Sequence, residues 1–399
     1  MKMKKYLLIT MTLLVSLVFS VQPVMAMDSQ NQSQQYADLP LCMPGYYPEN
    51  PADCLPLGPS QTIKSLRDEG FPYPLSGMPA HKPDPSLSNL PIRVANVAEG
   101  QGRVYASLDE AINGGNVIRN IGGGDNRFVA IVEQAYSNGN NYVRLLNGGW
   151  MQADPHYSSP TWQGLEFFET PESNLGFTID NVGSYSAASF SSPLSGISYT
   201  KFDAFPIYKT VEAEGYEWYQ ISPSEWMPSL KSRKVVIDTN TPPGVEGGKW
   251  INIDLHNQTL SAYENNELVF AAIVGTGSGE LYSDPGTYQI YEKREIDQMQ
   301  GAYKADRSDF FYYEGIPYAM YYNHAQAIHG IYWPTILGFK QSHGCVNMFA
   351  GDAHWLFNFA NVDDYVYVHD PSGETPVPTP TPVGTPGQEL IFSTPTPMP

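Results

Sequence analysis

From Arg93 onward, short apolar runs broken by glycine and asparagine dominate the sequence, and this pattern limits the chain to a mainly β fold. Between Ile251 and Leu255 apolar and polar residues alternate, as in a strand with one buried face. The pair Asn265–Asn266 joins two later apolar runs and is typical of a tight hairpin turn. Since 399 residues exceed one ordinary domain, we expect two or three domains, each with its own core.

An internal repeat supports small antiparallel β modules. Two units align without any gap: Gly139–Leu145 with Trp150–Met151, and Gly215–Ile221 with Trp226–Met227. Upstream of these, Val104–Tyr105 corresponds to Ile207–Tyr208. Each unit is typical of a β-hairpin that leads into a strand carrying tryptophan.

These units resemble the bacterial SH3-like modules that precede the catalytic domains of wall enzymes. We therefore expect one SH3-like β-barrel over residues 92–155, and a linker with a second over residues 156–241. As binding modules, they would hold glycan or stem peptide through exposed aromatic side chains. As spacers, they would bury their tryptophans in small cores.

The N-terminus is typical of an exported protein. Met1–Lys5 holds three lysines, Leu7–Phe19 is largely apolar, and Val24–Ala26 offers small residues at a cleavage site. This pattern predicts a secretory signal peptide over residues 1–26. No later stretch approaches eighteen apolar residues, so we expect no membrane span in the mature chain. The signal peptide predicts export across the cytoplasmic membrane, and the resemblance to modules of wall enzymes implies a location at the cell wall.

Residues 27–91 are rich in proline and polar residues and predict an irregular segment with a short helix over Ser60–Glu69. Three cysteines in an exported chain suggest one disulfide and one thiol. Cys42 and Cys54 flank a turn-rich loop and are the expected pair, two free thiols being the alternative. Cys345 is then left reduced.

The charge of the chain excludes one class of partner. The formal net charge is −19, and removal of residues 1–26 takes away three lysines and no acids, leaving 19 basic and 41 acidic residues, or −22. Such a balance opposes nucleic-acid binding by counterion release.

Residues 371–399 are rich in proline and threonine and predict a disordered tail.

The sharpest chemical signal is a cysteine with two nearby histidines. His329–Gly330 is followed by Ser342–Met348, which reads Ser-His-Gly-Cys-Val-Asn-Met. A thiol with a pKa of about 8.5 is only a few per cent thiolate at neutral pH, so a cysteine nucleophile needs a base beside it. His329 and His343 are both candidates, and with Cys345 they would alternatively supply three zinc ligands.

This pattern resembles the catalytic signature of YkuD-type L,D-transpeptidases. The resemblance implies a YkuD-type β-sandwich over residues 248–370 with a short helix after the nucleophile. It also implies that the aromatic segment Glu292–Ala325 covers the site as a lid. Apolar residues recur at helical spacing after the motif, so we expect Cys345 on the loop that enters this helix, where the helix dipole favours a thiolate.

Largely from this resemblance, we expect eight residues to have roles around the thiol. Cys345 would be the nucleophile, His329 the base and His343 the alternative base, and the carbonyl of Gly330 would orient His329. Gly344 and Ser342 would form the oxyanion hole and hold the loop, and Asn347 and Tyr332 would contact the substrate. The family more often has arginine where this chain has Asn347. Its absence removes a cation that would hold a substrate carboxylate.

The resemblance implies attack on the L,D peptide bond before a terminal D-alanine of a peptidoglycan stem, loss of that D-alanine, and transfer of the acyl group to an amine of a neighbouring stem. No cofactor is expected. With water as acceptor the same site would be an L,D-carboxypeptidase. A wall-binding protein with a degenerate catalytic domain is the alternative from another functional class.

Overall fold

The computed structural model describes residues 66–68, 70–71, 77–124, 126–156, 163–302, 307 and 310–377. The chain divides into two compact units, Met1–Gly77 and Met78–Pro399. In the first unit residues 66–68 are helical and are followed by a turn at Gly70, where the predicted helix was expected to stop. The predictions that lie outside the described residues are the signal peptide, the Cys42–Cys54 pair and the tail beyond residue 377.

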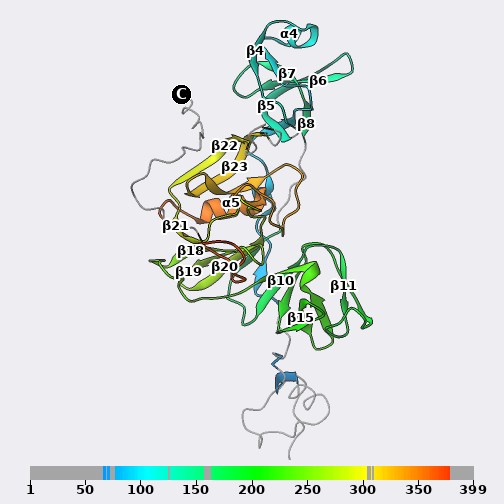
Figure 1. The fold of residues 1–399 in the computed structure, drawn as a ribbon, viewed down its shortest axis with the longest axis vertical. Coiled ribbons are helices and arrows are strands. Elements are labelled where there is room, and N and C mark those ends of the chain that lie inside the picture. Colours follow the sequence, from blue (N-terminus) through cyan, green and yellow to red (C-terminus); the bar gives the residue numbers. More distant parts are fainter. Residues whose placement is uncertain are drawn as a thin grey trace, which may run out of the picture. The chain divides into compact units, whose positions relative to one another are not determined.

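Among the described residues, seven strands form the first sheet of the C-terminal domain (Figure 1). Their order is β1 (Ala80–His81), β9 (Leu165–Phe167), β20 (Glu267–Ile273), β19 (Thr259–Glu264), β18 (Lys249–Asp254), β26 (Tyr365–His369) and β21 (Gly286–Gln289). β18, β19 and β20 form the predicted antiparallel meander. Asn265 and Asn266 both have positive φ, as the tight turn between β19 and β20 requires.

A second sheet of eleven described strands carries the functional motif at one end. Its main path is β25 (Val346–Phe349), β24 (Gln326–Ile331), β23 (Phe311–Asn323), β5 (Asn126–Ser137), β6 (Asn140–Leu145), β7 (Trp150–Gln152), β3 (Arg103–Tyr105) and β4 (Val117–Asn120). Three strands pair beside this path: β2 (Arg93–Asn96), β8 (Asp154–His156) and β22 (Glu292–Gly301).

The described remainder consists of two smaller sheets and four short helical elements. One sheet has the order β12 (Leu194–Tyr199), β11 (Val182–Tyr185), β16 (Glu225–Pro228), β15 (Tyr216–Ser222) and β14 (Lys209–Ala213), and the other has β13 (Ala204–Ile207), β10 (Asn174–Thr178) and β17 (Ser232–Val235). The helical elements are α4 (Leu108–Asn113), α5 (Ala350–Phe359) and the 3₁₀ turns η1 (Pro85–Ser88) and η2 (Ser229–Lys231).

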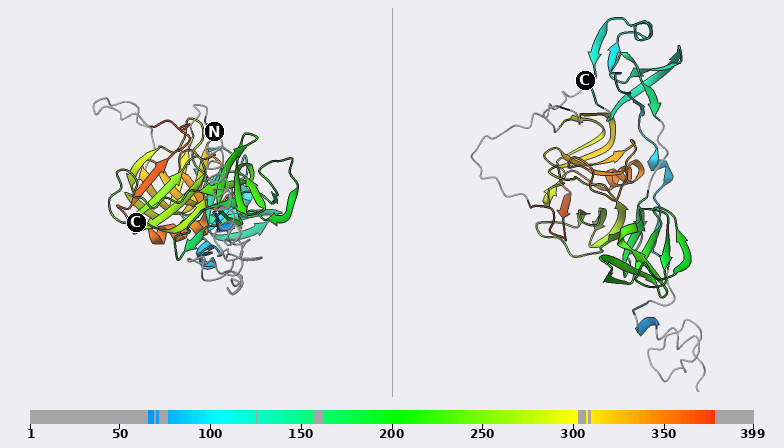
Figure 2. Two further views of the ribbon diagram at one scale, coloured as in Figure 1. Left: turned by 90° about the horizontal axis from the view of Figure 1, so that it is seen from below. Right: turned by 45° about the vertical axis from the view of Figure 1, so that its right-hand side comes forward.

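Helix α5 packs into the main core of the C-terminal domain, next to β23 and β24 (Figures 1 and 2). Its buried Ala353 and Leu356 join Ile251 and Ile253 of the first sheet and Ile328 of the second in one apolar cluster. Burying an apolar side chain of this size stabilises the fold by about 1.5 to 3 kcal/mol. The core therefore fixes the first sheet, the helix and the strand that carries the His-Gly step against one another.

The two predicted repeats have the same local structure. In the first repeat, β5–β7, Trp150 lies opposite Arg144; in the second, β14–β16, Trp226 lies opposite Gln220. These are the residues that the ungapped alignment matches. Trp150 and Trp226 are both half-buried.

The upstream part of the predicted repeat is wrong. Tyr105 of the first repeat pairs with Trp150, whereas Ile207, at the corresponding place of the second, pairs with Asn174 of β10. The residue that pairs with Trp226 is Tyr185 of β11. Strand partners that are far apart in the sequence are chosen by tertiary packing, so matching two short apolar dipeptides did not identify this one.

The first repeat is joined to the C-terminal domain by strand pairing. Residues 311–313 of β23 run parallel to residues 126–128 of β5. The buried Glu314 carboxylate accepts hydrogen bonds from Ala130 N at 3.0 Å and from Asn147 Nδ2 at 3.2 Å. A stretch expected to be linker contributes as well, since Leu165–Phe167 forms β9 and pairs with β20. No described helix is long and apolar enough to cross a membrane.

Candidate active site

The two halves of the motif lie on neighbouring parallel strands. In the register of β24 and β25, His329 lies opposite Asn347, and Cys345 directly precedes β25. The expectation that Cys345 lies on the loop entering the helix is wrong, because β25 intervenes and α5 begins only at Ala350. The helix dipole falls off within the first turn, so it does not account for the chemistry of this thiol.

Backbone hydrogen bonds hold the nucleophile loop against residues 275–278. Gly275 and Asn347 exchange two such bonds, at 2.9 and 2.8 Å. Ser342 N donates to Thr276 O at 2.9 Å, and Ser278 N donates to Ser342 O at 3.1 Å. The glycine-rich end of the meander thereby fixes both ends of the loop that presents Cys345.

Two serines brace the turn before the thiol. Ser342 Oγ donates to the carbonyl of Cys345 and accepts a hydrogen bond from Gly344 N at 3.2 Å. Ser283 Oγ donates to Gly344 O at 2.7 Å and accepts from Gly277 N at 3.0 Å. Gly344 has φ +111°, a conformation that side chains disfavour, so glycine is required there. Ser283 was not among the predicted site residues.

His329 is buried and its tautomer is fixed by the chain. Its Nδ1 lies 3.0 Å from the carbonyl oxygen of Gly330, which only accepts, so Nδ1 carries the proton and Nε2 is left as a base. Burial lowers the pKa of His329, and the Gly330 hydrogen bond and the Asp297 charge oppose this effect. A Cβ on Gly330 would lie 2.9 Å from Pro317 Cγ, so a larger residue would displace the strand.

Cys345 is half-buried, and its sulfur lies 3.7 Å from the carbonyl oxygen of Ala325. Burial raises the pKa of the Cys345 thiol to about 11, with a lowering contribution from a hydrogen bond at Ala327 and a further raising contribution from Asp297. The expected stabilisation of a thiolate is therefore wrong for the free protein. The raised pKa of Cys345 and the lowered pKa of His329 favour the neutral form of each group.

The segment expected to be a lid is largely a hairpin of β22 and β23, followed by the start of β24. On it, the buried Asp297 accepts a hydrogen bond from Tyr321 Oη at 2.5 Å and from Arg294 Nη1 at 2.9 Å. The charge of Asp297 acts on both His329 and Cys345. Sequence reasoning missed this carboxylate, because nothing local distinguishes it from neighbouring acidic residues.

Three other predicted site residues have different surroundings. His343 is exposed, and its ring stacks on Phe311 with centroids 5.2 Å apart. Asn347 is buried in the loop scaffold. Tyr332, expected to contact substrate, is a core residue: it is 5% exposed, packs with Val94 and donates its hydroxyl to Glu314 O at 2.6 Å. It cannot reach a ligand without opening that core.

The comparisons with known proteins identify the domain that carries this site. Residues 248–369 match the YkuD family model, the L,D-transpeptidase catalytic domain. The fold is mainly β, as expected, and the YkuD domain occupies the C-terminal region where the motif predicted it. No curated protein matches the chain.

Among the described residues, no group of three or more His, Cys, Asp and Glu side chains is placed to hold a metal ion.

Solved structures with similarity to part of the chain include three L,D-transpeptidases. A crystal structure from Stackebrandtia nassauensis is 24% identical over 33% of this chain and 60% of its own, with a TM-score of 0.26. The catalytic domain from E. faecium, solved by NMR, is 23% identical over 32% of this chain and all of its own, with a TM-score of 0.28. The enzyme from Mycobacterium smegmatis is 14% identical over 52% of this chain and 89% of its own, with a TM-score of 0.29. This chain thus spans less than two thirds of the Stackebrandtia protein.

Proposed function

We propose that the YkuD domain is a peptidoglycan L,D-transpeptidase that acts through a cysteine acyl-enzyme. The observation that carries the proposal is the pairing of β24 with β25, which brings the strand of His329 beside the residue that follows Cys345. His329 is favoured over His343 as base because its Nδ1 is held by Gly330, leaving Nε2 to accept a proton. His343 is exposed, and its ring stacks on Phe311.

In this mechanism the resting pair is neutral. As the Cys345 sulfur attacks the carbonyl carbon of the L,D peptide bond, its proton passes to His329 Nε2. A sulfur–carbon bond forms, the carbon–nitrogen bond breaks, and the D-alanine amine leaves with the proton from the imidazolium. The amine of a second stem then attacks the thioester and gives a proton to Nε2. The carbon–sulfur bond breaks, and the imidazolium returns that proton to the sulfur, which restores the thiol.

The developing oxyanion needs backbone donors, each worth about 3 to 4 kcal/mol in comparable acyl transfer. The amide of Gly344 already donates to Ser342 Oγ. We therefore assign this role to the amides of His343 and Cys345, and give Ser342 and Gly344 the task of holding the turn. The side chain of Asn347 is buried in the scaffold. Other groups must therefore bind the substrate carboxylate that an arginine at this position would hold.

The substrates in this proposal are peptidoglycan stems as donor and acceptor, so the enzyme would act outside the cytoplasmic membrane, at the wall. The test is to incubate the chain with disaccharide tetrapeptide and separate the products by chromatography and mass spectrometry. We expect cross-linked dimers and released D-alanine, their loss in His329→Ala, and their retention in His343→Ala.

Two outcomes would replace this proposal. Tripeptide without dimers would make the protein an L,D-carboxypeptidase. Absence of both products and of any adduct on the protein would leave a wall-binding protein.

A further inference from the structure

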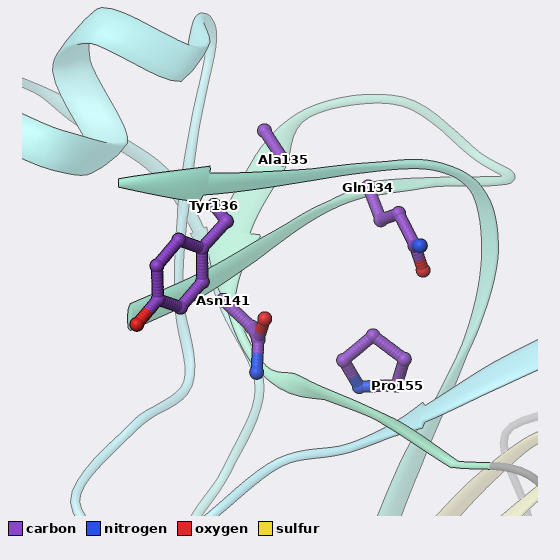
Figure 3. Close-up of a pocket in the computed structure, with 5 residues that line it drawn as sticks. All are labelled: Gln134, Ala135, Tyr136, Asn141 and Pro155. Carbon is purple, nitrogen blue, oxygen red and sulfur yellow. The ribbon is translucent and has the colours of Figure 1, made fainter. Parts of the chain in front are cut away.

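A hollow of about 400 Å³ lies on the first repeat, outside the residues of the candidate active site. Figure 3 shows its lining, which comes from three strands: Gln134, Ala135 and Tyr136 of β5, Asn141 of β6 and Pro155 of β8. Sites for small ligands commonly have volumes of about 300 to 1,000 Å³. The hollow is therefore large enough for a saccharide unit.

The hollow combines one aromatic side chain with two carboxamides. Tyr136 is 73% exposed although it lies within a paired strand. One exposed aromatic ring is unremarkable by itself, but this one borders a concave surface that also contains two carboxamides. Asn141 Nδ2 donates to Asp154 Oδ1 at 2.9 Å, which fixes the direction of that carboxamide.

The second repeat provides an internal comparison. Tyr136 lies opposite Asn141 in β5–β6, and at the matching place in β14–β15 Glu212 lies opposite Glu217. Glu217 is engaged within the protein, because it accepts hydrogen bonds from Lys234 Nζ at 2.8 Å. The hairpin therefore does not need an aromatic–amide pair in order to fold, and the pair in the first repeat calls for another explanation.

The charges around the hollow select the class of ligand. Its lining side chains carry no formal charge, and a charged group bonded to them is the carboxylate of Asp154, which accepts the hydrogen bond from Asn141. The whole chain has a net charge of −19, which disfavours polyanions.

A pyranose ring suits the site, because its C–H face matches the negative face of an aromatic ring and its hydroxyl and acetamido groups match carboxamides.

We propose that this hollow binds an N-acetylated hexosamine unit of a glycan strand; the choice of this glycan rests on the proposed function. Tyr136 is the stacking platform, and the carboxamide of Asn141 supplies a polar contact. Such a site would hold the enzyme on the polymer that carries its stem peptides.

The test is calorimetric titration of the full chain with chitotetraose, a neutral oligomer of N-acetylglucosamine. We expect Tyr136→Ala, and Tyr136→Glu, which copies the second repeat, to weaken binding at least about tenfold, as for loss of an aromatic anchor. Tyr136→Phe keeps the ring face and should stay within about threefold of the native affinity. Tyr216→Ala, which removes an exposed tyrosine of the second repeat, is the matched control and should bind like the native chain.

Unchanged affinity in Tyr136→Ala, or no binding by the native chain at about 5 mM chitotetraose, would overturn the proposal. So would displacement of the saccharide by a peptide of residues 373–399, since the occupant would then be the proline-rich tail. Saccharide binding without an acyl adduct on Cys345 would refute the proposed transpeptidase activity but support the saccharide site. An acyl adduct on Cys345 without saccharide binding would support the transpeptidase activity and refute the saccharide site. Unchanged thermal melting of the Tyr136 variants excludes misfolding.

Discussion

The reactivity of Cys345 towards an alkylating reagent should rise steadily with pH and show no plateau near neutrality. Burial raises the pKa of this thiol to about 11 from an ordinary value of 9.0. At pH 7 about one thiol in 10,000 is then ionised, against about one in 100 for a thiol of pKa 9. Since the thiolate is the nucleophile, alkylation of the folded chain should be about a hundredfold slower than that of the unfolded chain.

The assay is a time course with iodoacetamide at pH 6 to 10, with each cysteine followed by the mass of its own peptide. Cys345 in the folded chain should gain about tenfold in rate per pH unit, whereas the urea-unfolded chain should level off near pH 9. A plateau between pH 6 and 8 in the folded chain would mean a preformed thiolate–imidazolium pair. That result would refute both the neutral ground state and the assignment of His329 as a base that acts only during attack.

Three further predictions concern the scaffold. Burial raises the pKa of Asp352 to about 7, and a group with a raised folded-state pKa loses its stabilising contribution as pH rises through that value. Between pH 4 and 8 the free energy of unfolding of the native chain should therefore fall by roughly 4 kcal/mol at most relative to that of Asp352→Asn in urea unfolding, and parallel pH profiles would contradict this. Gly344→Ala forces a side chain into φ +111° and towards Gln326, so it should cost about 1 to 3 kcal/mol in the same assay and abolish turnover; normal turnover would contradict the bracing role. Ser283→Ala leaves the buried amide of Gly277 without its partner and should cost about 1 to 3 kcal/mol, whereas an unchanged melting temperature would show that this bond is dispensable.

Local patterns predicted the parts of the fold that are decided locally. The alternation from Ile251 to Leu255 and the Asn265–Asn266 turn are visible in the sequence because strand faces and positive φ depend on neighbouring residues. The His-Gly and Ser-His-Gly-Cys steps predicted the YkuD domain through their resemblance to its signature, and the structure pairs the strand of the first step with the strand that follows the second.

What the sequence did not predict depends on distant parts of the chain. Tyr185, and not Ile207, pairs with Trp226, because sheet order is settled by the whole core. Tyr332 is polar enough to suggest a substrate contact, but strand pairing with the first repeat buries it. The pKa of Cys345 is raised by burial and by the charge of Asp297. Both causes depend on how the chain folds around the thiol, and the motif alone does not contain them.

The central claim, that the Cys345 sulfur carries the acyl group of a stem peptide, is tested most directly by mass spectrometry of the chain after brief exposure to disaccharide tetrapeptide. The account predicts a thioester confined to the peptide that contains Cys345, absent in Cys345→Ala and formed much more slowly in His329→Ala. Turnover by the Cys345→Ala variant, or an adduct on any other residue, would contradict it.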